Sequence, residues 1–127
     1  MSKRSHTIKP DQNIIGALKK IPSPIYDKKH KHYVYFINDV DHNQTRFEHI
    51  AKQYHELRVR DIESIFGGIN DYVLYKKSKN HKDTYYYYIN RKGMDKGFVQ
   101  VAIKLIEGET NKYYVKTIFI TYRLSFD

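Results

Sequence analysis

Cysteine is absent from the 127 residues of this chain. Its absence excludes a disulfide framework, a catalytic thiol and a zinc site built from thiolates. Long apolar stretches are missing too. The basic start, residues 1–6, is not followed by the apolar region of a secretory signal, and no segment approaches the roughly 18 apolar residues that span a bilayer. We therefore expect no membrane partner and a cytoplasmic location, including the cytoplasm of a target cell if a specialised route delivers the protein there.

Several short motifs that commonly carry chemistry are also missing. The sequence has no glycine-rich phosphate loop, no nucleophile elbow and no HExxH pair. His30 and His32 lie two residues apart in a basic segment without a clear carboxylate partner, so we expect no metal site there. Nothing in the sequence indicates a cofactor.

Positive charge is the most informative bulk property. The chain has 23 Lys and Arg residues against 14 Asp and Glu residues, a formal charge of +9 and a pI near 9.6. It also has 13 Tyr and 6 Phe residues, which could stack on bases. This combination favours a nucleic-acid partner, because basic domains gain affinity from phosphate attraction and counterion release. A charge that serves solubility or an acidic protein partner is the alternative.

Apolar residues recur with helical spacing in three segments. Residues 10–20 begin with a proline, which suits a first helical turn, and Pro22 and Pro24 follow them. Residues 47–54 and 62–69 each carry apolar side chains at positions i, i+3, i+4 and i+7, and residues 43–45 can cap the first of these stripes. The two stripes form either one bent helix or two helices that are broken near residues 57–59.

Aromatic and β-branched residues dominate five other segments, which we predict to be strands: 33–37, 72–76, 84–89, 98–106 and 113–122. In the fourth segment one face should carry Val99, Val101, Ile103 and Leu105, and the opposite face should carry Gln100, Ala102 and Lys104. Residues 27–32 are predicted to form a basic loop. We therefore predict an α+β fold in a single domain over residues 1–127, with N-terminal helices packed on a roughly four-stranded antiparallel β-meander.

The remaining reactive side chains suit cleavage of RNA by its own 2′-hydroxyl. This reaction needs a base, an acid and cations that stabilise the phosphorane, and imidazole exchanges protons near neutral pH. His49 and His55 both lie in a predicted helix, where His49 should point away from the apolar stripe and His55 should lie at its margin. The alternative is that both are ordinary surface histidines.

Lysines and threonines offer candidate phosphate contacts. Lys76 and Lys77 begin a basic run that is otherwise typical of a solvated loop. Thr117, Thr121 and Arg123 share one face of the last predicted strand, although β-propensity alone would explain the threonines. Tyr85–Tyr88 should alternate between faces, so at most half of these rings could stack on bases.

Taken in order, these parts resemble a known family. Residues 45–123 are similar to the phage-encoded branch of the barnase/EndoU/colicin/RelE-like nuclease superfamily. The likeness lies in the helical Phe47-Glu48-His49-Ile50 with a second histidine six residues on, the following Asp61-Ile62-Glu63-Ser64-Ile65, a strand ending in two lysines, and a final strand that carries Lys and Thr. Residues 1–44 would be an N-terminal extension of one helix and one strand.

The resemblance implies an RNA-cleaving toxin, held in check by an immunity protein or antitoxin, with helices on a four-stranded antiparallel sheet. By position it implies His49 and His55 as acid and base, Lys76 or Lys77 as the group that stabilises the phosphorane, and Thr117 and Thr121 as phosphate contacts. Further candidate RNA contacts are Lys79, Lys82, Lys104, Lys116, Tyr122 and Arg123.

Two functional hypotheses follow from the sequence. The first is a metal-independent endoribonuclease whose inhibitor would present an acidic surface to the basic protein. The alternative is a non-catalytic basic module that binds nucleic acid or a phage or host protein.

Overall fold

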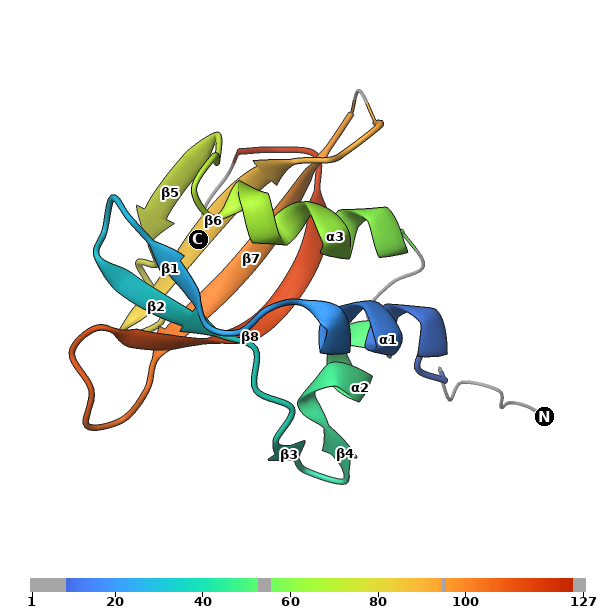
Figure 1. The fold of residues 1–127 in the computed structure, drawn as a ribbon, viewed down its shortest axis with the longest axis horizontal. Coiled ribbons are helices and arrows are strands. Elements are labelled where there is room, and N and C mark those ends of the chain that lie inside the picture. Colours follow the sequence, from blue (N-terminus) through green and yellow to red (C-terminus); the bar gives the residue numbers. More distant parts are fainter. Residues whose placement is uncertain (1–8, 53–55, 95, 125–127) are drawn as a thin grey trace.

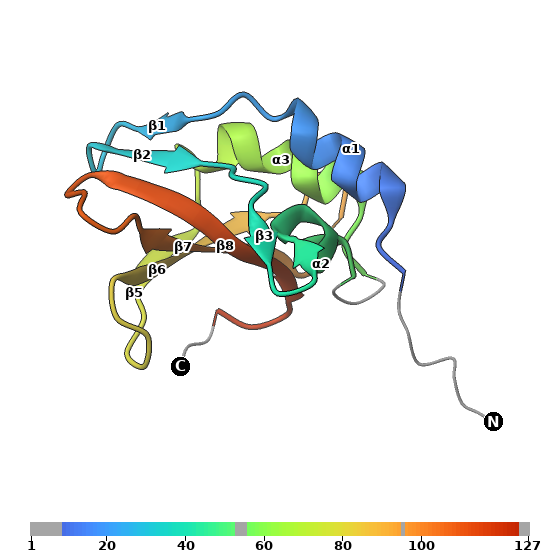
Figure 2. The same cartoon turned by 90° about the horizontal axis from the view of Figure 1, so that it is seen from below.

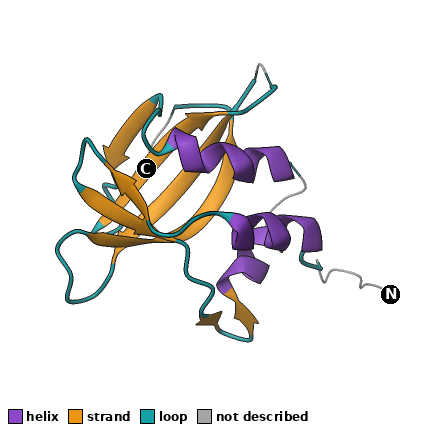
Figure 3. Ribbon diagram, in the orientation of Figure 1, coloured by secondary structure: helices purple, strands orange, loops and turns teal. Residues whose placement is uncertain are grey.

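The computed structural model describes residues 9–52, 56–94 and 96–124. Within them the chain forms helices and strands that alternate early and end in a run of long strands (Figures 1 and 3). In chain order the elements are α1 (Gln12–Lys20), β1 (Ile25–Asp27), β2 (His32–Tyr35), β3 (Val40–Asp41), β4 (Gln44–Thr45), α2 (Arg46–Lys52), α3 (Val59–Gly68), β5 (Leu74–Lys77), β6 (Thr84–Asn90), β7 (Phe98–Leu105) and β8 (Lys112–Thr121). None of the helices in these residues has the length and apolar character needed to cross a bilayer.

The main sheet has six strands in the order β1-β2-β8-β7-β6-β5. Strands β5 to β8 form the predicted antiparallel meander. The α+β class is thus confirmed, but the expected four-stranded antiparallel sheet is wrong. The hairpin β1–β2 extends the sheet, and β2 pairs with β8 in parallel, so the sheet is mixed. This pairing joins residues about 80 positions apart, a contact that no local sequence pattern encodes.

One face of the sheet carries the core. Figure 2 shows α1 and α3 along the same side of the strands. The predicted alternation in β7 is confirmed for Val99, Val101 and Ile103, which are fully buried and belong to the main core cluster, whereas Leu105 is only half-buried. Residues of α1 and β2 belong to the same cluster as residues of α3 and β8, so the first 44 residues share the core of the remainder.

The helices lie close to the segments that the apolar stripes predict, but α1 begins at Gln12, after Pro10, which was expected in its first turn. The Asp11 side chain accepts hydrogen bonds from the backbone N–H groups of Asn13 and Ile14 at the start of α1. The second and third stripes form two helices, α2 and α3, and not one bent helix. Phe66, which was expected on the buried stripe of α3, is 50% exposed. The other three apolar residues of that stripe, Ile62, Ile65 and Ile69, are fully buried in the main core.

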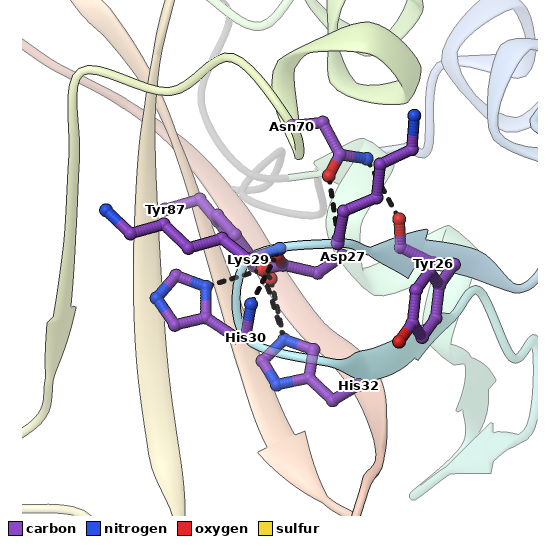
Figure 4. A network of polar contacts seen from close by, with 8 residues as sticks. Tyr26, Asp27, Lys29, His30, His32, Asn70 and Tyr87 are labelled. Atoms are coloured by element: carbon purple, nitrogen blue, oxygen red, sulfur yellow. Dashed lines mark hydrogen bonds and ion pairs between the residues drawn. The ribbon is translucent and has the colours of Figure 1, made fainter.

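A buried carboxylate organises the first hairpin. Asp27 is fully buried, and its Oδ1 accepts the backbone N–H groups of Lys29 and His30, each at 3.0 Å (Figure 4). Asn70 ties the hairpin to the end of α3, because its side chain bonds Lys28 N and Tyr26 O, both at 2.9 Å. The prediction of one basic loop over 27–32 is therefore wrong at both ends. Asp27 ends β1 and His32 begins β2, with a tight turn between them.

The carboxylate partner that sequence inspection did not find for His30 and His32 is Asp27. Its Oδ2 lies 2.8 Å from His30 Nδ1 and 3.4 Å from His32 Nε2, and it accepts the Tyr87 hydroxyl at 2.5 Å. These atoms are engaged in direct hydrogen bonds, and no group of three or more metal-ligating side chains is arranged around an ion site in the part of the chain that the structure describes.

The pKa values of Asp27 and His32 in this network both lie below their usual values. Burial opposes ionisation of Asp27, but hydrogen bonds from Tyr87 and His30 outweigh it, so the pKa of Asp27 lies below its usual value. Burial lowers the pKa of His32, and the nearby Asp27 charge only partly offsets that effect. The folded state thus favours a charged Asp27 and a neutral His32.

A second buried carboxylate fixes α3 against the end of β6. Asp61 is fully buried and pairs with Arg91 in a two-pronged contact, with Nε to Oδ1 and Nη2 to Oδ2 both at 3.0 Å. Asp61 also accepts the backbone N–H of Arg58 at 2.9 Å, which begins the helix. The same carboxylate therefore caps α3 and anchors it to the sheet.

The first prediction concerns this ion pair. Arg91→Met should lower the free energy of unfolding by about 3–5 kcal/mol, because it leaves the Asp61 charge buried without its partner. Urea unfolding at neutral pH measures the loss. The control Lys92→Met, at an exposed neighbour, should change stability by no more than about 0.5 kcal/mol. Adding Asp61→Leu to Arg91→Met should recover part of the loss, and a further loss would contradict this account.

The second prediction concerns acid stability. Because the folded pKa of His32 is lowered, the unfolded chain takes up a proton first as pH falls below the ordinary value of 6.5, and stability should fall from there. The lowered pKa of Asp27 adds a further loss only near and below 3.8. In His32→Gln the urea midpoint should drop less between pH 7 and pH 5 than in the wild type. His42→Asn, at an exposed turn position, should keep the wild-type pH dependence, and an equal drop in all three proteins would refute the role of His32.

Candidate functional site

The face of the sheet opposite α1 and α3 carries a different set of side chains. Residues paired across neighbouring antiparallel strands lie on the same face. One row across β5, β6, β7 and β8 consists of Lys76, Tyr86, Ala102 and Thr117, and the next row consists of Leu74, Tyr88, Gln100 and Phe119. Tyr86, Tyr88 and Ala102 form a small apolar cluster separate from the main core. This face therefore combines a packed floor with polar side chains.

A cavity of about 330 Å³ opens on this face and extends to α2. Its size falls in the range of small-ligand sites. We call it the open-face pocket. It is lined by Arg46, His49, His81, Thr84, Tyr86, Gln100, Ala102, Lys116, Thr117 and Phe119.

A β-bulge brings two adjacent residues of β8 to this pocket. Ala102 pairs with Thr117, whereas Ile103 pairs with Val115, so Lys116 has no paired residue on β7. An extra residue in one strand breaks the strict alternation of side chains. Lys116 and Thr117 can consequently line one pocket although they are neighbours in the sequence.

The start of α2 is fixed by a reciprocal cap. Thr45 N donates to Glu48 Oε1 at 2.8 Å, and Glu48 N donates to Thr45 Oγ1 at 3.2 Å. Phe47 and Ile50 are buried under α1 and the sheet. Arg46 and His49, three residues apart, lie on the other side of the helix and reach the pocket.

Arg46 is held rigidly at the pocket wall. Its Nε and Nη2 bond the two carboxylate oxygens of Asp39 at 2.7 Å and 3.2 Å. The guanidinium carbon lies 4.9 Å from the centre of the Tyr114 ring, and Nη1 donates to the Lys116 carbonyl at 3.4 Å. The hydrogen bond from Arg46 holds the pKa of Asp39 below its usual value. These contacts fix one positive charge at a defined place beside the pocket.

His49 is oriented by a glutamine. Its Nδ1 lies 3.0 Å from Nε2 of Gln44, the first residue of β4. Gln44 Oε1 is buried and makes no hydrogen bond within the described residues. The amide can therefore turn over without losing a bond, and can face either a bare Nδ1 or an Nδ1–H. Gln44 thus suits an imidazole that changes its protonation state.

His81 reaches the pocket from the opposite side, in the turn between β5 and β6. Ser78 shapes this turn: its buried Oγ accepts the backbone N–H groups of Asn80 at 3.3 Å and of His81 at 3.0 Å. The Ser78 backbone N–H donates to the Thr84 carbonyl at 2.9 Å. The backbone under His81 is therefore fixed while its side chain stays exposed.

Three of the residues singled out from the sequence meet in the pocket: His49, Lys116 and Thr117. Lys76 lies in the same cross-strand row as Thr117, whereas Lys77 pairs with Tyr85 and so belongs to the other face. The lysines outside the pocket lie near its rim: Lys79 and Lys82 in the β5–β6 turn, and Lys104 paired with the lining residue Thr84. His55 lies outside the described residues.

The end of β8 does not join this group. Thr121 Oγ1 hydrogen-bonds with the backbone of Arg123, and neither residue lines the pocket. The Tyr122 hydroxyl donates to Glu56 Oε1, before α3. These three residues are thus engaged in contacts outside the pocket, at the C-terminal end of β8.

Sequence reasoning missed Arg46, His81, Thr84 and Phe119. The alternation of β7 predicted that Gln100 and Ala102 lie opposite the core residues, and that of β6 predicted only that Tyr85–Tyr88 alternate between faces. No periodic signal pointed to Arg46. His81 lay inside the basic run that was singled out for its lysines. The sequence did not indicate that His81 would line the pocket, because this depends on how the β5–β6 turn packs in the tertiary structure.

Hydrogen-bond donors and cations dominate the polar lining of the pocket. Lys116 and Arg46 carry positive charge, and Asp39 pairs with Arg46 from outside the lining. No carboxylate is found in the lining that the structure describes, so the pocket does not present the oxygen ligands that Mg²⁺ prefers. Its donor-rich wall suits a phosphate group.

Comparison with known proteins yields no relative: no family model, no curated protein and no solved structure matches the chain. Functional inference therefore depends on the geometry of the open-face pocket.

Proposed function

We propose that the protein is a metal-independent endoribonuclease of the barnase/EndoU/colicin/RelE-like type. The observation that carries this proposal is the convergence of His49, Lys116 and Thr117, from elements about 70 residues apart, on one pocket with the fixed guanidinium of Arg46. The bulge in β8 and the cap of α2 both serve this convergence.

The residues divide into the roles that RNA cleavage requires. Arg46 and Lys116 would stabilise the negative charge that develops on the phosphorane, and the Thr117 hydroxyl would hold a phosphate oxygen. His49 would act as the general base once the Gln44 side-chain amide is turned over from the placement shown, so that Oε1 accepts Nδ1–H and the imidazole Nε2 can take the 2′-hydroxyl proton. Phe119 and Tyr86 supply aromatic surface in the pocket, suited to contact with a base.

The wider surroundings fit a negatively charged chain. The exposed lysines of the β5–β6 turn stand beside the pocket and can contact neighbouring phosphates. With a net charge of +9, a protein inhibitor that covers this face would need an acidic surface. We include this in the proposal: the enzyme acts as a toxin or effector and an acidic immunity protein or antitoxin restrains it.

The third prediction tests the reaction itself. Purified protein incubated with total RNA in EDTA should produce fragments that end in 2′,3′-cyclic phosphate and begin with 5′-hydroxyl. His49→Ala should lower the cleavage rate by about 10²–10⁴, the usual contribution of a general acid or base. Lys20→Ala, which removes an exposed charge from α1 on the other side of the sheet, should cleave like the wild type.

Two outcomes would count against the nuclease. Intact RNA, bound with an affinity that falls as salt rises, would favour a non-catalytic binding module. Fragments that require a divalent cation or end in 3′-hydroxyl would indicate a different chemistry. Urea unfolding of His49→Ala distinguishes a lost base from a lost fold.

The fourth prediction tests phosphate contact separately from cleavage. Binding of a 2′-O-methyl RNA oligonucleotide, which cannot be cleaved by its own 2′-oxygen, should show a log–log salt dependence. Lys116→Ala should reduce the slope by about one, the value for one lost phosphate contact. Lys20→Ala should keep the wild-type slope, and an unchanged slope in Lys116→Ala would remove Lys116 from the RNA interface.

A further inference from the structure

We propose that His81 is the general acid of this site, donating the proton that the 5′-oxygen needs as it leaves. This inference rests on the proposed ribonuclease function and adds a second catalytic residue to it. Its basis is positional: the open-face pocket is lined by two imidazoles, His49 from α2 and His81 from the β5–β6 turn. Base and acid must act on the two different oxygens on either side of the phosphorus, so they have to approach from separate elements.

The composition of the lining restricts the choice of acid. Its titratable side chains are Arg46, His49, His81, Tyr86 and Lys116. Arginine, lysine and tyrosine ordinarily keep their protons at neutral pH, whereas imidazole both gains and loses one there. With His49 assigned as the base, His81 is the remaining described group in the pocket that can supply a proton and recover it in each turnover.

The local structure suits this role. The buried Ser78 hydroxyl holds the backbone of His81 at 3.0 Å, so the residue has a defined position although it lies in a turn. The imidazole itself is exposed, so it can exchange a proton directly with solvent. The charged residues that share the pocket with it are Arg46, which is paired with Asp39, and Lys116.

The chemical step balances without a further reactant. The 2′-hydroxyl proton passes to His49, the 2′-oxygen forms a bond to phosphorus, and the bond from phosphorus to the 5′-oxygen breaks. His81 gives its proton to that oxygen, so the products are a 2′,3′-cyclic phosphate and a 5′-hydroxyl. His49 then carries one extra proton and His81 lacks one, and exchange with water restores both.

The fifth prediction uses two substrates that differ in their leaving group. One is an RNA oligonucleotide, and the other has sulfur in place of the 5′-bridging oxygen at the cleavage site. A thiolate leaves without protonation, so the second substrate does not need the acid. His81→Ala should lower kcat/KM about 10²–10⁴-fold on the ordinary substrate and much less on the sulfur substrate. His49→Ala should be impaired on both substrates.

The pH profile supplies an independent readout. In EDTA the wild type should show a bell-shaped kcat/KM, and His81→Ala should lose the limb that falls at higher pH, where the acid would be deprotonated. His81→Gln should behave like His81→Ala. His42→Asn, a change of a histidine in the β3–β4 turn whose φ of +63° asparagine tolerates, should keep both limbs and the wild-type rate.

The outcomes separate the two proposals. If the wild type cleaves RNA and His81→Ala matches it, or is equally impaired on both substrates, the assignment of His81 is overturned while the ribonuclease stands. If the wild type does not cleave RNA, both proposals fall. Urea midpoints of the His81 variants equal to that of the wild type exclude unfolding as the cause of a loss.

Discussion

The alternation of side chains along β6, β7 and β8 is the constraint on which the rest of the structure depends. Alternate residues of β6 and β7 belong to the main core under α1 and α3, as do Val115 and Ile118 on either side of the β8 bulge, and this burial holds the helices on one face. The intervening residues are thereby committed to the opposite face, where Tyr86, Gln100 and Thr117 meet. The pocket is thus a consequence of the core: a one-residue slip in register would exchange the two faces and destroy both.

Buried carboxylates position the β1–β2 turn and α3, which the alternation of the strands does not fix. Asp27 needs hydrogen bonds to remain charged without water, and satisfying it joins the β1–β2 turn to Tyr87 on β6. Asp61 does the same for α3 through Arg91. Near the pocket the carboxylate is the exposed partner: Asp39 is half exposed and orients the guanidinium of Arg46. Each ion pair or network therefore fixes a backbone segment or a functional cation.

Several local features were predictable because they depend on near neighbours. The helix at Gln12–Lys20, the four meander strands and the faces of β7 follow from periodicity and capping. Pairings across long stretches of chain were not predictable, and the β1–β2 hairpin was missed for that reason. Its residues are a mixture of polar and apolar types. Asp27 and His32 can be buried because each forms a hydrogen bond with the Tyr87 hydroxyl. For the same reason the sequence could not show which of Lys76 and Lys77 lies on the face of the pocket, because the register of β5 with β6 sets their faces.

The sequence by itself determined that the chain is basic and aromatic, that it combines helices with strands, and that His49, Lys116 and Thr117 were worth following as site candidates. These are properties of composition and short-range order. The tertiary structure alone decided which of these residues meet, since a pocket is made of contacts between segments distant along the chain. The bulge at Lys116, the fixed guanidinium of Arg46 and the approach of His81 exist only once β8, α2 and the β5–β6 turn have packed together.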